Sequence, residues 1–240
     1  MTDLRYLPAA ADVTAFEATV TETSADYVIL DGTYFYPGGG GQPADRGTIE
    51  WADGEATVVD VRKNHGDVRH YVDGTALPDP GTTVTGRIDA ERRGRLTRLH
   101  TAQHVLSRVA LDEFGAATVG NGLSVDGGWV EFEGATLDDE DVATVERLTN
   151  AAIERDLTVH KAERPRSAVE DAVPDGRAQL DAIPDHVDPM RVVEIGDFDV
   201  CPCGGTHVDR LGDVGAVRVT SRSREDGVTR IAFDSEPPDR

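Results

Sequence analysis

The sequence predicts an α+β protein with two domains, a small β-barrel-like domain over residues 1–92 and an α+β domain over residues 93–240. Two observations predict this class. In the first part, apolar residues alternate in short runs, which is the period of strands. From about Arg92 they recur every three or four residues, which is the period of a helix. A chain of 240 residues is long enough for two cores of this size.

Short strands separated by turn residues fill the first predicted domain. The strands are expected in three stretches, residues 16–31, 47–74 and 82–89. Asp-Gly pairs mark the breaks, at Asp31-Gly32 and, as hairpin turns, at Asp53-Gly54 and Asp73-Gly74. Several short strands at this spacing are typical of a small barrel or a sandwich.

A long helix is predicted where the second domain begins. In residues 92–115, RRGRLTRLHTAQHVLSRVALDEFG, the apolar positions have helical spacing. Thr97 is the candidate N-cap, and Gly115 is the expected stop because glycine often ends a helix.

The remaining elements alternate between strands and helices. In chain order we expect a strand pair around residues 122–132, a helix at 137–156, a strand at 157–164, a short helix at 165–172, one strand at 190–200 that runs into a cysteine loop, and a closing hairpin at 215–234. Acidic residues in the first turn of the second helix favour its start there.

The charge is strongly acidic. The chain has 45 acidic and 24 basic residues, a formal net charge of −21, and only Lys63 and Lys161 are lysines. This composition indicates a halophilic surface, because at about 1 M salt the Debye length is about 3 Å and self-repulsion is screened. The alternative is an ordinary acidic soluble protein. In concentrated salt the charge does not exclude an RNA partner.

No apolar run is long enough to span a membrane, and the N-terminal residues do not resemble a signal peptide. We therefore expect a cytoplasmic protein with no membrane partner.

The two cysteines, Cys201 and Cys203, are too close in sequence for a favourable disulfide, so reduced thiols are expected.

Two pairs of metal-ligand residues stand out. His100 and His104 are four residues apart on the predicted helix, so both rings share one face and could clamp zinc. The alternative is a polar helix face. In zinc proteases a glutamate follows the first histidine, whereas here the residue is Thr101, which argues against proteolysis by that mechanism.

Cys203 and His207 form the second pair, and the Gly-Gly-Thr between them allows a tight turn. Alone, this pair could be a buried cysteine beside a surface histidine. Together the pairs give a Cys-His₃ set without carboxylates, which points to one zinc per chain rather than magnesium or calcium. Cys201 is the spare thiol. Four protein ligands are typical of a structural site, whereas a catalytic site keeps one position open, and both arrangements are possible for this sequence.

A run of four glycines, residues 38–41, is not a nucleotide site, because no Gly-Lys-Ser/Thr follows it and no dinucleotide spacing is present. We therefore expect no nucleotide cofactor. Such a loop lets backbone approach another surface closely, and the alternative is a plain flexible turn.

Four arginines begin the long helix and could contact phosphates or form a solvated face: Arg92, Arg93, Arg95 and Arg98.

Three stretches together resemble the alanyl-tRNA editing family, which comprises the editing domain of alanyl-tRNA synthetases and its free-standing AlaX relatives. They are HTAQHVLS at residues 100–107, RVVEIGDFDVCPCGGTHV at 191–208 and TYFYPGGGGQPADRG at 33–47. The last is similar to the glycine-rich motif of the larger free-standing form. The resemblance implies an α+β zinc-binding editing domain after the barrel, with zinc on His100, His104, Cys203 and His207.

The resemblance also implies the activity. Free-standing members are ATP-independent deacylases that act in trans on mischarged tRNA(Ala), chiefly Ser-tRNA(Ala) and in some cases Gly-tRNA(Ala). Asn121 falls where relatives place a substrate-contacting residue, and the glycine loop with Gly39 and Gly40 is implied to help set serine specificity. Gln42, next to these glycines, is a further candidate, or else a loop amide that caps nearby backbone.

The physical need for such an enzyme is clear. A binding pocket separates serine or glycine from alanine by only about 1–3 kcal/mol, so a second, hydrolytic site is required for accuracy. Two other classes fit the same residues: a non-catalytic zinc-stabilised tRNA-binding module, and a zinc-dependent hydrolase of small esters that needs no tRNA.

Overall fold

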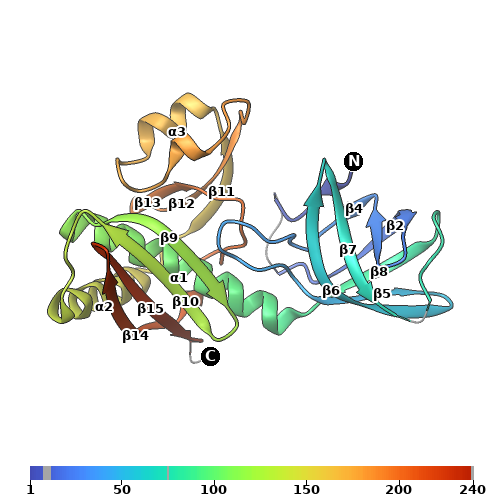
Figure 1. The fold of residues 1–240 in the computed structure, drawn as a ribbon, viewed down its shortest axis with the longest axis horizontal. Helices are drawn as coiled ribbons and strands as arrows, with labels where there is room; N and C mark the ends of the chain where they lie inside the picture. Colours follow the sequence, from blue (N-terminus) through green and yellow to red (C-terminus); the bar gives the residue numbers. More distant parts are fainter. Residues whose placement is uncertain (8–11, 75, 239–240) are drawn as a thin grey trace. The chain divides into compact units, whose positions relative to one another are not determined.

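The protein divides into two compact units, Met1–Leu96 and Thr97–Arg240. The structure is a computed structural model, and it describes residues 1–7, 12–74 and 76–238. Figure 1 shows strands in the first unit, and both strands and helices in the second. The predicted α+β class is therefore confirmed.

The first unit is a closed six-stranded barrel, in the order β2-β3-β7-β6-β5-β8, with every pairing antiparallel. Its strands are β2 (Ala15–Thr23), β3 (Tyr27–Leu30), β5 (Gly47–Trp51), β6 (Gly54–Asn64), β7 (Asp67–Asp73) and β8 (Thr83–Ile88). A short parallel pair, β1 (Asp3–Leu4) and β4 (Gly32–Thr33), stands beside it. Alternate residues face inward and fill the barrel, among them Val28, Leu30, Ile49 and Val58. The prediction of a barrel is confirmed.

One predicted hairpin of this barrel is wrong. Asp73-Gly74 follows β7, but the neighbours of β7 are β3 and β6. The reversal before β7 lies instead at His65 and Gly66, which both have positive φ. The error has a physical reason: an Asp-Gly pair reports a local turn, whereas barrel closure decides which strand becomes the neighbour.

Helix α1 (Ala90–Phe114) begins seven residues before the predicted N-cap. Asp89 is the residue that caps it, because its side chain accepts a hydrogen bond from the backbone N–H of Arg92 at 3.0 Å. Thr97 lies inside the helix and is buried. The predicted stop is confirmed, since Gly115 has a φ of 65° and donates its N–H to the carbonyl of Leu111.

The second unit contains a four-stranded antiparallel sheet in the order β14-β15-β10-β9. The strands are β9 (Ala117–Ser124), β10 (Gly127–Glu133), β14 (Ala216–Glu225) and β15 (Val228–Glu236). One face of the sheet packs with α1 and with α2 (Asp139–Glu154) in a single core that includes Val105, Phe132, Val145, Ile231 and Phe233. This core holds the middle of α1 firmly against the sheet (Figure 1).

A three-stranded sheet, β11-β12-β13, completes the second unit and is covered by α3 (Arg166–Ala172). Its strands are β11 (Val159–Arg164), β12 (Met190–Ile195) and β13 (Asp199–Pro202), and the 3₁₀ turns are η1 (Leu180–Ala182) and η2 (Leu211–Val214). The expected single strand over residues 190–200 is therefore two strands. The chain reverses after Ile195, where Gly196 has a positive φ, and β13 pairs back onto β12.

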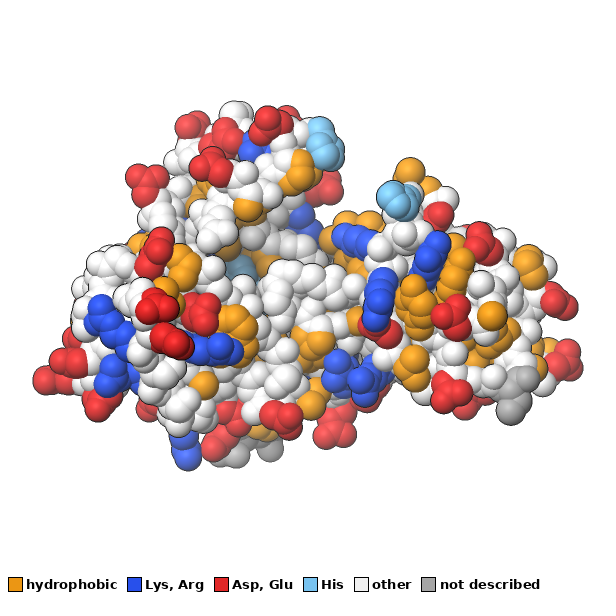
Figure 2. All heavy atoms as spheres, in the orientation of Figure 1, with side chains coloured by type: hydrophobic (Ala, Val, Ile, Leu, Met, Phe, Trp, Pro, Cys, Tyr) orange, Lys and Arg blue, Asp and Glu red, His pale blue; other side chains and the backbone are white. Residues whose placement is uncertain are grey.

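Acidic side chains are spread over the face drawn in Figure 2, with smaller groups of arginine and lysine between them. None of the helices in the described part of the chain combines the length and the apolar character that a membrane crossing requires.

Candidate metal centre

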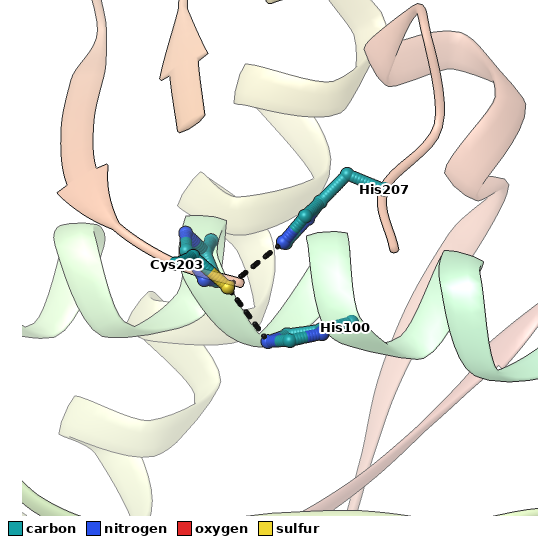
Figure 3. A group of neighbouring side chains, drawn as sticks. His100, Cys203 and His207 are labelled. Atoms are coloured by element: carbon teal, nitrogen blue, oxygen red, sulfur yellow. Dashed lines mark hydrogen bonds between the residues drawn. The ribbon is translucent and has the colours of Figure 1, made fainter. Parts of the chain in front are cut away.

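Four side chains from separate parts of the second unit converge. One ligand atom from each of His100, His104, Cys203 and His207 lies within 4.8 Å of the others. Helix α1 presents the two histidines one turn apart, Cys203 directly follows β13, and His207 lies in the loop after it. Figure 3 shows the side chains of His100 and His207 pointing toward Cys203. The two predicted pairs therefore form one cluster.

The distances between the ligand atoms suit a tetrahedral ion. Cys203 Sγ lies 3.5 Å from Nε2 of His100 and 3.2 Å from Nε2 of His207. Zinc bonds of about 2.0 Å to nitrogen and 2.3 Å to sulfur give tetrahedral edges of about 3.5 Å. The same nitrogens that face the sulfur in Figure 3 are thus spaced as zinc ligands would be.

Hydrogen bonds fix the cysteine loop onto the helix. The hydroxyls of Thr97 and Thr206 are 2.8 Å apart and both are buried. The backbone N–H of Gly205 donates to Cys203 Sγ at 3.4 Å. Arg191 of β12 holds Cys203 from both sides, because its carbonyl accepts the Cys203 N–H and its guanidinium donates to the Cys203 carbonyl. The sulfur is therefore held in place by backbone contacts.

Burial keeps the three histidines neutral. Desolvation, followed by the positive charge of Arg191, lowers the pKa of His100 to about 3. Desolvation is also the main reason that the pKa values of His104 and His207 lie well below the ordinary value. Neutral imidazoles offer lone pairs, which is the form that binds a metal.

The thiol of Cys203 is under opposing influences. Burial raises its pKa, whereas the N–H of Gly205 and the charges of Arg191 and Arg177 lower it. Burial outweighs these groups, so the pKa of the Cys203 thiol is raised overall, and ligation of a metal by the thiolate would release a proton.

One buried ring nitrogen has no hydrogen bond within the described structure, Nδ1 of His104. Asp199 Oδ2 lies 3.9 Å from it, beyond hydrogen-bonding distance, and that carboxylate is bound by the buried guanidinium of Arg177. A buried polar atom without a partner costs about 1–3 kcal/mol. The ring of His104 therefore lacks one stabilising interaction in the described structure. Together with the N₃S donor set, this fits zinc.

Cys201 is not a member of the cluster. It is buried, and desolvation raises the pKa of its thiol to about 12. Cys201 lies within β13 and its Sγ is 3.6 Å from the carbonyl of Pro202, whereas Cys203 lies beyond the end of the strand.

The predicted substrate-contacting residues are divided between the two units. Asn121 is half-buried in β9 of the second unit, opposite Val130 of β10. Gly39 and Gly40 are exposed in the loop of the first unit, while Gln42 is only 2% exposed there. The structure thus brings the four expected ligands together in the second unit, whereas Gln42 and the glycines belong to the first unit.

The glycine loop owes its shape to backbone that other residues rarely adopt. All four glycines have positive φ: Gly38, Gly39, Gly40 and Gly41. Gly39 and Gln42 exchange two backbone hydrogen bonds across it, and the Tyr36 hydroxyl donates to the Gly39 carbonyl at 2.8 Å. These hydrogen bonds define a tight turn at residues 39–42.

Both interpretations of the arginine group are wrong for Arg93. Its side chain is 2% exposed and binds the buried carboxylate of Asp45. Arg92 also turns inward and donates to the Ala44 carbonyl at 3.1 Å. A phosphate contact or a solvated face needs an exposed guanidinium, which Arg93 lacks, whereas Arg92 is half-buried; both arginines bind the loop that follows the glycines.

Sequence reasoning did not find Arg191, Arg177 or Asp199. The available signal was an arginine in a largely apolar strand, MRVVEI, where a charge needs a specific partner. No local pattern marks Arg177, because its partner Asp199 is 22 residues away.

Comparison with known proteins gives matches to two family models. The model for class II (A) tRNA synthetases matches residues 6–92. The model for the second additional domain of threonyl and alanyl tRNA synthetases matches residues 190–232, which include Cys203 and His207.

Similar curated proteins fall into two groups. An alanine–tRNA ligase of Methanopyrus kandleri is 41% identical over 86% of this chain, and one of Halorubrum lacusprofundi is 37% identical over 92%. The chain spans about a quarter of the length of these ligases, 23% and 24%. The alanyl-tRNA editing protein AlaX-M of Methanosarcina barkeri is 36% identical over 85% of this chain and 86% of its own length.

Proposed function

Because this chain belongs to the alanyl-tRNA editing family, we propose that it is a trans-editing deacylase of mischarged tRNA(Ala). Its chief substrate is Ser-tRNA(Ala), and Gly-tRNA(Ala) is the second. The zinc-binding editing domain spans residues 93–240, and the enzyme works in the cytoplasm without ATP.

The observation that supports this proposal is the convergence of His100, His104, Cys203 and His207. One relative that this chain matches along most of its length is an alanyl-tRNA editing protein, AlaX-M. The four ligand-type side chains and this relative together support hydrolysis of an aminoacyl ester as the reaction.

These four residues would hold one zinc ion. When bound, zinc supplies a Lewis acid for the aminoacyl ester. The three histidines are buried, whereas Cys203 is half-buried and Gly204 beside it is exposed, with no atom within 4 Å of a Cβ built there. We infer that the aminoacyl end of the tRNA approaches from the side of Gly204.

The reaction consumes one water. Its oxygen bonds to the aminoacyl carbonyl carbon, the ester C–O bond breaks, and a proton passes to the ribose oxygen, which releases serine and tRNA. Backbone N–H groups near the carbonyl stabilise the negative charge that develops on its oxygen. The ester is already activated, so a hydroxyl of the terminal ribose can assist in place of a side-chain base.

Specificity must come from polar groups that recognise the serine hydroxyl and spare alanine. We propose Asn121 for this contact, with Gln42, Gly39 and Gly40 as further determinants. Asn121→Ala should then reduce the preference for serine over alanine, measured as the ratio of the two deacylation rates. A variant that deacylates both tRNAs as the wild type does would remove Asn121 from this role.

The decisive experiment measures loss of serine from Ser-tRNA(Ala), with Ala-tRNA(Ala) in parallel, in buffer with molar potassium chloride because of the charge of −21. Cys203→Ala should abolish hydrolysis, and Cys201→Ala, the matched control, should keep it. A folded, zinc-loaded wild type that binds tRNA without hydrolysis would leave only a binding module. Equal cleavage of seryl-adenosine and Ser-tRNA(Ala) would indicate a hydrolase of small esters.

A further inference from the structure

Thr101 lies between the two helical ligands, and its buried hydroxyl meets three groups at once. Its Oγ1 is 3.0 Å from the carbonyl oxygen of Thr97, 3.2 Å from Nδ1 of His207 and 3.2 Å from the backbone nitrogen of Val208. The side chain is fully buried, so no solvent competes for these contacts.

The hydrogens of this group can be counted. A threonine hydroxyl has one hydrogen to donate and two lone pairs to accept with. The carbonyl of Thr97 can only accept, so it takes the hydrogen, and the N–H of Val208 can only donate, so it uses one lone pair. The second lone pair faces Nδ1 of His207, which must then carry a hydrogen.

We propose that Thr101 is a positioning residue that fixes His207 as the Nδ1–H tautomer. A neutral imidazole with its hydrogen on Nδ1 has a bare lone pair on Nε2. That Nε2 is the atom 3.2 Å from Cys203 Sγ, so the lone pair points into the ligand cluster. The inference rests on the proposed metal site and assigns a role to the residue that replaces the protease glutamate.

The opposite tautomer of His207, with its hydrogen on Nε2, would not suit metal binding. If Thr101 donated to Nδ1, the ring hydrogen would sit on Nε2, and His207 could not ligate a metal through that atom. The N–H of Val208 donates to the hydroxyl in either arrangement, so the choice depends on which group receives the hydroxyl hydrogen. Thr97 offers the shorter contact, 3.0 Å against 3.2 Å for His207 Nδ1, and this favours the Nδ1–H form.

The first test reads the tautomer in the metal-free protein by nitrogen-15 NMR of the imidazoles, with His207 assigned from a His207→Asn variant. We expect Nδ1 protonated and Nε2 bare in the wild type and in Thr101→Ser, which keeps the hydroxyl. Thr101→Val should lose this preference. Protonated Nε2 in the wild type, or an unchanged spectrum in Thr101→Val, overturns the proposal.

The second test measures zinc affinity by competition with a chelator. Loss of an outer hydrogen bond to a ligating histidine weakens metal binding about 10–100-fold, so we expect this loss in Thr101→Val and near-normal affinity in Thr101→Ser. Thr149→Val is the matched control, because the Thr149 hydroxyl is buried without a hydrogen-bond partner among the described residues. Zinc affinity in Thr101→Val equal to the wild type overturns the proposal.

These results are independent of the deacylation assay. A wild type with the expected tautomer and a Thr101-dependent zinc affinity, but without hydrolysis of Ser-tRNA(Ala), supports the role of Thr101 and contradicts only the proposed function.

Discussion

Asp45 and Arg93, which are 48 residues apart, form a buried ion pair in the first unit, with Nε of Arg93 3.0 Å from Oδ1 of Asp45. The same carboxylate accepts the backbone N–H of Tyr36 at 2.6 Å, and the guanidinium donates to the Tyr34 carbonyl at 2.8 Å. One pair thus ties both ends of the glycine loop to the first turn of α1.

Breaking this pair should cost much stability. Asp45→Asn leaves the guanidinium of Arg93 buried without its counter-charge, and we expect a loss of about 3–5 kcal/mol in the free energy of unfolding, measured with denaturant. Glu50→Gln is the control, because Glu50 pairs with Arg87 at 2.9 Å on the exposed surface and should contribute under about 1 kcal/mol. An equal loss of unfolding free energy in Asp45→Asn and Glu50→Gln would contradict a stabilising buried pair of Asp45 and Arg93.

His70 should make the stability of the barrel depend on pH. Burial lowers its pKa to about 4, while the ring accepts from the Thr33 hydroxyl and donates to the Val28 carbonyl. The unfolded chain binds a proton near pH 6.5 and the folded chain only near pH 4. Stability therefore falls with falling pH across this window, by about 1.4 kcal/mol per pH unit.

The measurement is the free energy of unfolding of the wild type and of His70→Gln at several pH values between 6.5 and 5. The variant should show a flatter dependence on pH. His65→Gln, in an exposed turn of the same barrel, is the control and should follow the wild type. Parallel curves for the wild type and His70→Gln would refute a buried neutral His70.

The two cysteines should react differently. Cys203 is half-buried and Cys201 is buried, with a thiol pKa raised to about 12. Because the thiolate is the reactive form, we expect iodoacetamide to modify Cys203 before Cys201 in the metal-free protein, and added zinc to protect Cys203. Mass spectrometry of the peptides reports both sites. Faster modification of Cys201 would exclude the proposed ligand set.

The conformation of Gly40 leads to a graded prediction. Its φ is +57°, and no atom lies within 4 Å of a Cβ built there, so a substitution is opposed by backbone strain alone. Asparagine tolerates this conformation, so Gly40→Asn should cost a few tenths of a kcal/mol, whereas Gly40→Val should cost about 1–2 kcal/mol. Thermal unfolding of the two variants tests the order, and equal stability would mean that the loop adopts another conformation.

Several features of the fold follow from local sequence. The period of the apolar residues predicts the barrel strands and α1, and Gly115 predicts where α1 ends. The start of α1 was missed because Thr97 and Asp89 are both good caps, and the choice between them depends on packing. The break at Gly196 was missed because a glycine inside an apolar run can belong to a strand or to a turn.

By itself, the sequence determined the residue types of the metal centre and their spacing within each pair. His100 and His104 share a helix face because a helix repeats every 3.6 residues, and that holds in any fold. Only the tertiary structure decided that Cys203 and His207 lie beside them, since a contact across about a hundred residues depends on how α1 packs against the sheet.

The same limit applies to the surroundings of the site. Thr101, Arg191 and Arg93 have ordinary side chains whose roles depend on partners far along the chain: His207, Cys203 and Asp45. Hydrogen bonds and ion pairs act over a few ångströms in space, whatever the separation in sequence. Local patterns therefore specify which ligands are available, and folding specifies which groups orient them.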